Sequence, residues 1–227
     1  MIKDKLQGWK KGDPIGYIRK NIPQFKVPQY KGERYEALVP DTLNLAERAG
    51  LGVNVLTSAT DPEADYELYW LVYFRANPPF MKHEADDPGL QAKFQQSLPL
   101  MRIISGSSLN EEVERKWMEV TLQMLGADGL AYVPTVGRPW ARSSRFTWGE
   151  TEDENFTRSS DCGILLSVMS LCYKRSKDSA WKEAIKNMVE GLIALAIDRG
   201  SYAYFPGIVF GPGKKPRDEK MPTGMSS

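Results

Sequence analysis

The stretch GADGLAYVP, residues 126–134, follows a predicted helix that ends at Leu125. A second predicted helix ends at Arg199, and the chain then reads GSYAYFP, residues 200–206. Both helices end in glycine, which adopts the left-handed conformation common at helix C-termini more easily than other residues do. Both then run into a short segment that contains aromatic residues and proline. This repetition predicts a stack of helical hairpins, and a ligand site would lie where the loops gather at one end.

Hydrophobic residues recur at helical spacing through most of the chain, which predicts an all-α fold. We expect six helices in three antiparallel hairpins, stacked as a partial or assembled (α/α) toroid. They are expected from about Asp41, over 64–76, from Asp87 to about Ile104, over 109–125, over 158–175, and from Asp178 to about Asp198. The 64–76 segment is apolar nearly all round, so a buried helix or a strand fits it. Its length and its helical neighbours favour the helix.

Short polar and small residues mark the expected helix ends and contacts. Aspartates at the starts of three helices are expected to act as N-caps, and Ser108 and Glu111 have the spacing of a capping box. Gly106 is expected to end the third helix, and Pro99 to kink it. Small side chains at positions 46, 49, 50 and 52 would let a neighbouring helix approach the first one closely.

The composition predicts one large domain with its own core, since 41% of the 227 residues are hydrophobic. We expect an N-terminal arm over 1–36, a helical-hairpin domain over 37–206 and a flexible C-terminal tail over 207–227. Lys and Arg number 30 and Asp and Glu 29, so the charge favours neither a nucleic acid nor a membrane as partner. We find no apolar run of transmembrane length and no signal-peptide pattern, so we expect a soluble, non-exported chain.

The two cysteines, Cys162 and Cys172, lie about 15 Å apart along one predicted helix. A disulfide requires Cα atoms within roughly 7 Å, so these residues cannot pair with each other. Both lie among aliphatic residues, which indicates buried structural thiols. With a single histidine and two separated cysteines, we expect no metal site and no cofactor.

A run of motifs in order resembles the six-hairpin glycosidase-like proteins, bacterial members of which act on polysaccharides that contain uronic acids. The motifs are VPDTLNLAERAGLGVNVLT (39–57), NPPFMKHEADD (77–87), FQQSLPLMRIISGS (94–107), WMEVTLQMLGADGLAYVP (117–134) and GRPWA (137–141). The resemblance implies an (α/α) toroid with a carbohydrate site in the funnel formed by loops at one end. A closed toroid needs more than three hairpins, so we expect an N-terminal half or a truncated member.

Hydrolysis of a glycosidic bond usually requires two carboxyl groups within about 9.5 Å of each other, one of them an acid with a raised pKa. The loop that carries His83, Glu84 and Asp86 offers such groups, and Asp41 at the start of the first helix is expected to face the same funnel. A helix cap is the simpler interpretation of Asp41, and a solvated loop that of the cluster. Asp128, before a glycine, is first of all a turn former.

The loop GRPWARSSRFTWGE, residues 137–150, is the predicted substrate-binding segment. Its Arg138 and Arg142 alternate with Trp140 and Trp148, and aromatic faces stack on sugar rings while arginine binds carboxylates bidentately. Arginines among aromatic residues also suit single-stranded nucleic acid. The acidic residues that follow would repel phosphates, so we expect no nucleic acid. Tryptophans that simply pack onto the domain remain the structural alternative.

The sequence therefore predicts a carbohydrate-processing, glycoside hydrolase-like protein that acts on or binds an anionic glycan. The alternative is a non-catalytic helical-repeat protein that binds a partner or a glycan. Three apolar hairpins leave their terminal helices uncovered, so we also expect a homo-oligomer.

Overall fold

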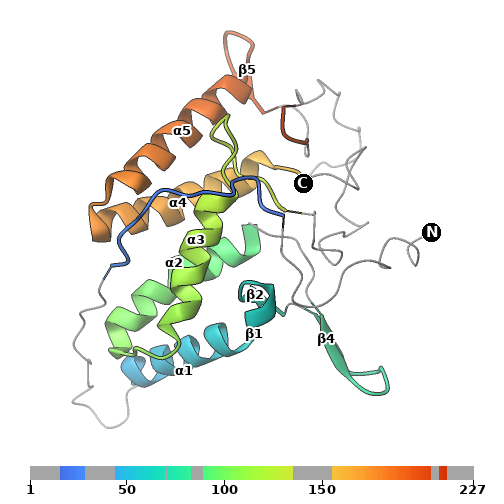
Figure 1. Cartoon of the computed structure of the whole chain (residues 1–227), viewed down its shortest axis with the longest axis vertical. Coiled ribbons are helices and arrows are strands. Elements are labelled where there is room, and N and C mark those ends of the chain that lie inside the picture. The colour runs from blue at the N-terminus through green and yellow to red at the C-terminus, as the bar shows by residue number, and fades with distance from the viewer. Residues whose placement is uncertain are drawn as a thin grey trace.

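The computed structural model describes residues 16–28, 44–69, 71–82, 89–134, 155–205 and 210–213. These residues form five α-helices, a short 3-10 helix and three two-stranded antiparallel sheets (Figure 1). The helices are α1 (Leu45–Ser58), α2 (Gly89–Ser105), α3 (Glu111–Gln123), α4 (Ser159–Ser176) and α5 (Ser179–Leu195). The other elements are β1 (Thr60–Asp61), η1 (Pro62–Ala64), β2 (Glu67–Leu68), β3 (Leu71–Tyr73), β4 (Phe80–Lys82), β5 (Ile197–Asp198) and β6 (Ala203–Tyr204). No helix in these ranges is long and apolar enough to cross a membrane.

The expected all-α toroid is wrong, because the described residues mix helices with small sheets. The helix expected over 64–76 is instead β2 and β3, which pair with β1 and β4. Asp65 and Tyr66 have positive φ angles of 53° and 60°, which end η1 and turn the chain back. Tyr69 then donates its amide to the carbonyl of Ala59 at 2.9 Å. Pairing with β1 before this run and with β4 after it outweighs local helix formation, which is why the hydrophobic periodicity predicted the wrong element here.

Helix α1 begins after Asn44, whose side chain accepts a hydrogen bond from the amide of Glu47 at 3.1 Å. The N-cap expected at Asp41 is thus supplied by Asn44, and Asp41 itself lies outside the described residues. Helix α2 packs antiparallel on α1. A Cβ on Gly50 would meet Ser105 at 3.8 Å, and one on Gly52 would meet the Met101 sulfur at 2.8 Å. The close approach expected at the small residues of α1 is confirmed.

Gly106 ends α2 with a φ of 68°, as expected. The expected capping box is wrong, because α3 begins at Glu111 and Asn110 makes no side-chain cap. A buried arginine fixes this connection instead. Arg102 donates from Nε to the Glu114 carboxylate at 2.8 Å, and its other nitrogens donate to the carbonyls of Ser107 and Asn110.

Helix α3 lies in the middle of the molecule, between α1 on one side and α5 on the other (Figure 1). Its residues Val113 and Trp117 belong to a smaller apolar cluster with α1, α2 and β2. Its residues Met118 and Leu122 belong to a larger cluster with α2, α4 and α5. Both clusters therefore depend on α3, which buries opposite faces against them.

The GADGLAYVP stretch forms a small buried hairpin after α3. Leu125 and Ala131 form an antiparallel bridge, and Asp128 stabilises the turn by accepting from the amide of Leu130 and the hydroxyl of Tyr132. Asp128 is a turn residue, as the sequence indicated. Burial first, and then Asp128, raise the pKa of the Tyr132 hydroxyl. Tyr132 is 1% exposed, so this stretch belongs to the core.

After this hairpin, three segments of the chain pair with one another just before α4 begins. Val133 pairs with Phe156, and Thr157 pairs with Phe210. Phe210 falls in the expected C-terminal tail, yet it is 6% exposed and packs in the larger core cluster. Cys162 packs against these pairings, since its sulfur and the hydroxyl oxygen of Thr157 lie 3.4 Å apart, within hydrogen-bond distance.

Helix α5 begins where expected, because the Asp178 side chain accepts from the amide of Ala180 at 2.9 Å. The stretch GSYAYFP is again a hairpin, in which β5 pairs with β6 and Gly200 has a φ of 83°. The repetition in the sequence is therefore a helix followed by a β-hairpin, once after α3 and once after α5. It is not a repeated pair of helices.

Candidate functional site

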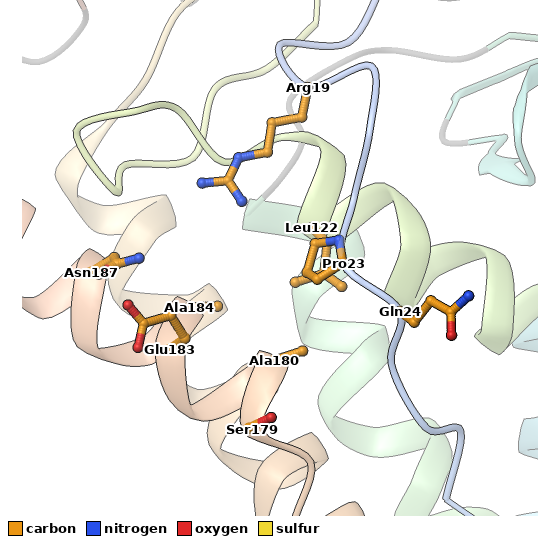
Figure 2. Close-up of a pocket in the computed structure, with 9 residues that line it drawn as sticks. All are labelled: Arg19, Pro23, Gln24, Leu122, Ser179, Ala180, Glu183, Ala184 and Asn187. Atoms are coloured by element: carbon orange, nitrogen blue, oxygen red, sulfur yellow. The ribbon is translucent and has the colours of Figure 1, made fainter.

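Residues 16–28 form an extended segment, here called the strap, which lies across α3 and α5 (Figure 1). An open cleft of about 380 Å³ separates the strap from α5. This volume lies within the range of small-molecule sites in proteins. The cleft is lined by Arg19, Pro23, Gln24, Leu122, Ser179, Ala180, Glu183, Ala184 and Asn187 (Figure 2).

Hydrogen bonds at both ends hold the strap in place. At one end, the Arg19 amide donates to the Gln123 carbonyl at 3.0 Å, and Tyr17 donates to Asp65 at 2.7 Å. At the other end, the Lys26 amide donates to the Asp178 carboxylate at 2.5 Å. The strap is thus fixed to both α3 and α5, and it forms one complete wall of the cleft.

Arg19 provides the cationic end of the cleft. Its guanidinium extends toward the turn that follows α3, and Nη2 donates to the Gly126 carbonyl at 3.4 Å (Figure 2). That bond is long and uses one of five N–H donors, so the group retains donors for a ligand.

The opposite wall is one face of α5. Ala180, Glu183, Ala184 and Asn187 follow the three- and four-residue spacing that places side chains on the same face of a helix. Pro23 of the strap lies in front of Leu122 of α3, and these two residues with Ala184 give the cleft an apolar base (Figure 2).

The cleft combines an apolar base with a guanidinium, amides, a hydroxyl and a carboxylate. Such a surface can bind a polar ligand that also has an apolar face. Glu183 is the one carboxylate among the described residues that line it. An acid/base pair for glycoside hydrolysis requires a second carboxyl group at a defined separation. The described part of the cleft therefore supports binding and supplies no such pair.

A carboxyl group with a raised pKa lies in the core, away from the cleft. Burial raises the pKa of Glu114 to about 8, and Arg175 opposes this rise. A raised pKa is what a general acid needs. However, Glu114 is bonded to Arg102, is 4% exposed and borders a void of about 10 Å³, the size of one water molecule. No sugar can reach it there, so it is a structural carboxyl group.

The predicted catalytic residues Asp41, His83, Glu84 and Asp86 lie outside the described residues. Their neighbours in the chain are nonetheless placed. Residues 83–86 precede the start of α2, whereas Asp41 precedes α1, whose early residue Gly50 faces Ser105 at the other end of α2. The expectation that Asp41 shares a funnel with residues 83–86 relied on a helix over 64–76. That helix is absent from the described chain, so this reason no longer holds.

The predicted binding residues Arg138, Trp140, Arg142 and Trp148 also lie outside the described residues. The base of their loop is well defined, because the amide of Val133 donates to the carbonyl of Phe156 at 2.7 Å. Val133 and Phe156, which flank this loop in the sequence, thus lie side by side near the start of α4. The start of α2 lies on the same side of the molecule (Figure 1), and α2 contacts α4 through a bond from Gln96 to the Ile164 carbonyl.

Sequence reasoning missed the cleft. Arg19 fell within the expected N-terminal arm over 1–36, and Gln24, Glu183 and Asn187 carried no motif. The helical spacing of residues 180, 183, 184 and 187 was readable, but nothing in the sequence indicated that the strap faces them. No protein-family model, no curated protein and no solved structure matches the chain.

Proposed function

We propose that this chain is a carbohydrate-processing, glycoside hydrolase-like protein that binds an anionic oligosaccharide or polysaccharide, with the strap cleft as a sugar-binding site. The observation that carries the proposal is the pairing of an apolar base with amide and guanidinium groups in one cleft. A sugar ring has the matching chemistry, because its C–H groups form apolar faces and its hydroxyl groups lie around the edge.

Each kind of lining group has a role toward such a ligand. Pro23, Leu122 and Ala184 would pack on the C–H face of a ring. Asn187 can both donate to and accept from hydroxyl groups, since a side-chain amide carries both functions. Arg19 would bind the carboxylate of a uronic acid through a charge-assisted hydrogen bond. The ligand class that suits this set is an acidic saccharide.

Catalysis remains a proposal that rests on Glu84, Asp86, His83 and Asp41. A second candidate function, binding without catalysis, is favoured by one observation, namely the single carboxylate among the described lining residues. The two functions differ in one measurable respect. A hydrolase releases new reducing ends from a bound polysaccharide, and a binding protein does not.

The test is calorimetric titration with uronic-acid-containing oligosaccharides, for the wild type and the variants Arg19→Gln and Asn187→Ala. We expect each variant to weaken binding about tenfold, the loss of roughly one good hydrogen bond to a charged or polar group. Lys186→Ala is the matched control, because Lys186 is exposed on the same helix but does not line the cleft. Equal affinities in all four proteins would refute the cleft as the site.

Hydrolysis is tested separately by assaying reducing ends with the same saccharides. If the chain is an enzyme, changing Glu84 and Asp86 singly to the amides should reduce activity by far more than tenfold. Binding with no release of reducing ends by the wild type would establish the second candidate function.

A further inference from the structure

The hairpin that follows α5 exposes aromatic side chains. The aromatic hairpin, defined as residues 197–205, carries Tyr202 at 62% exposure and Phe205 at 48%. The equivalent hairpin after α3 instead buries its tyrosine, Tyr132, at 1%. The same local structure thus serves the core in one case and displays aromatic rings in the other. The exposed rings of Tyr202 and Phe205 contribute little to the core and are accessible to a ligand.

The aromatic hairpin is internally fixed in shape. The Arg199 amide donates to the Tyr202 carbonyl at 2.9 Å, and the Gly200 amide donates to the Asp198 carboxylate at 2.7 Å. Gly200 takes a φ of 83°, which few other residues adopt. Tyr202 is therefore held in a short, well-defined turn, which limits the entropy lost when its ring contacts a ligand.

A cation lies beside the rings. The Arg199 guanidinium lies 5.9 Å from the centre of the Tyr204 ring, and its Nη2 donates to the Tyr204 hydroxyl at 3.3 Å. The rings of Tyr202 and Tyr204 are 6.2 Å apart and inclined by 31°. The exposed ring of Tyr202, the half-buried ring of Tyr204 and the Arg199 guanidinium thus lie together on one surface. Rings of this kind stack on sugars, and arginine binds carboxylates.

We propose that Tyr202, Tyr204 and Arg199 form a second saccharide-binding surface, which takes an acidic sugar unit of a long polysaccharide whose other units lie in the strap cleft. This inference rests on the proposed function of the cleft. The two surfaces are joined by α5. Asn187 lies nine residues before Ala196, where the helix ends, which is about 13 Å along the axis. A short oligosaccharide can occupy one surface, and only a longer chain can contact both.

The proposal predicts that affinity depends on ligand length. In the wild type, a polysaccharide gains affinity over a disaccharide, because binding at the second surface becomes intramolecular. We expect Tyr202→Ala and Arg199→Gln to weaken polysaccharide binding about tenfold and to leave disaccharide binding at the cleft unchanged. The matched control is Tyr73→Ala, which removes another half-exposed tyrosine from a two-stranded hairpin.

The experiment measures the affinities of these four proteins for an acidic disaccharide and for the corresponding polysaccharide. Equal polysaccharide affinity in the wild type and in Tyr202→Ala would refute the second saccharide-binding surface without contradicting the proposal that the strap cleft binds sugar. Equal losses in Tyr202→Ala and Tyr73→Ala also overturn the second surface. If the wild type binds neither saccharide, the proposed function fails, and this inference fails with it. A changed solution mass of Tyr202→Ala would instead identify a protein interface and refute the proposal.

A second experiment uses only the wild-type protein, so its result does not depend on whether the variants fold. Tyrosine nitration followed by mass spectrometry should modify Tyr202 in the free protein, and bound polysaccharide should protect it. Tyr132 should stay unmodified in both samples because it is buried. Nitration of Tyr202 at the same rate with and without a polysaccharide that binds would contradict the proposal.

Discussion

Gly129 lies directly against the backbone of Asn187. A Cβ atom on Gly129 would lie 2.1 Å from the Asn187 carbonyl oxygen, and one on Gly191 would lie 2.3 Å from the Asp128 carbonyl oxygen. Two glycines, one on each side, thus allow the turn after α3 and helix α5 to touch backbone to backbone. The same contact orients the α5 face that carries Asn187 into the strap cleft.

Gly191→Ala should therefore destabilise the protein by several kcal/mol, although alanine inside a helix normally favours folding by about 1 kcal/mol over glycine. The cause is the clash with the turn, which neither backbone can relieve cheaply. Gly163→Ala is the control, because Gly163 lies in α4 with no atom near its missing Cβ. Urea denaturation should show Gly163→Ala at least as stable as the wild type. A stabilised Gly191→Ala variant would mean that α5 and the turn are not in contact.

Arg102→Ala should cost about 3–5 kcal/mol of unfolding free energy, because the buried Glu114 carboxyl group loses the donor that Arg102 gives it, and each buried acceptor left without a donor costs about 1–3 kcal/mol. It also removes the donors that hold the carbonyls of Ser107 and Asn110. The comparison is Arg115→Ala, which breaks a pair with Glu119 on the surface and should cost less than about 1 kcal/mol. Similar losses of unfolding free energy in the two variants would show that the buried Arg102–Glu114 contact stabilises the protein no more than a surface ion pair does.

The raised pKa of Glu114 makes stability depend on pH. Burial raises this pKa from 4.5 to about 8, so the folded protein holds a proton that the unfolded chain releases. The stabilisation from that proton is complete below pH 4.5 and is lost as the pH rises through about 8. Glu114→Gln lacks this titration. The stability of the wild type relative to Glu114→Gln should therefore fall between pH 5 and pH 9, as measured by urea denaturation at each pH.

Both cysteines should resist thiol reagents in the folded protein. Cys162 is 0% exposed and Cys172 is 7% exposed, and burial raises the pKa of Cys172 to about 12. Thiolate is the reactive form, so little of it forms at neutral pH. Reaction with a disulfide reagent should follow the rate of unfolding and become fast in denaturant. Rapid labelling of two thiols under native conditions would contradict this burial.

Self-association remains a prediction, and α1 is the surface that supports it best. Leu51 and Val55 are 49% and 64% exposed on this helix, and their four-residue spacing places them on one face. Apolar side chains grouped in this way favour contact with a second copy. Light scattering should give a mass above 25.6 kDa that falls in a Leu51→Lys, Val55→Lys double variant. A wild-type mass of one chain at all concentrations would refute it.

Local signals predicted much of the helical part correctly. Asp178 was recognisable as a cap, Gly106 as a helix end and the small residues of α1 as a helix contact. Cys162 and Cys172 were correctly placed in the interior. Each of these features depends on residues close together in the chain, so sequence patterns are informative about them.

The sheets and the cleft could not be read in the same way. The segment from Tyr66 to Tyr73 is rich in aromatic and apolar residues, which suit a buried helix and a strand equally well. Its strands form because they pair with β1 earlier in the chain and with β4 later in it, and because the positive φ angles of Asp65 and Tyr66 turn the chain back after η1. The cleft depends on contacts such as that of Lys26 with Asp178, which lie 152 positions apart in the chain. A local sequence pattern cannot predict a contact between residues so far apart in the chain.

The bridge between Val133 and Phe156 joins the two ends of the segment 134–155, so the core on either side does not depend on the residues within that segment. The core needs an unchanged backbone on either side of residues 134–155, whereas ligand recognition benefits from freedom to vary. Because the ends of this loop are joined and tied to Phe210, changes in its length or composition need not disturb α3 or α4. Substitutions between residues 134 and 155 should therefore leave the backbone of α3 and α4 in place.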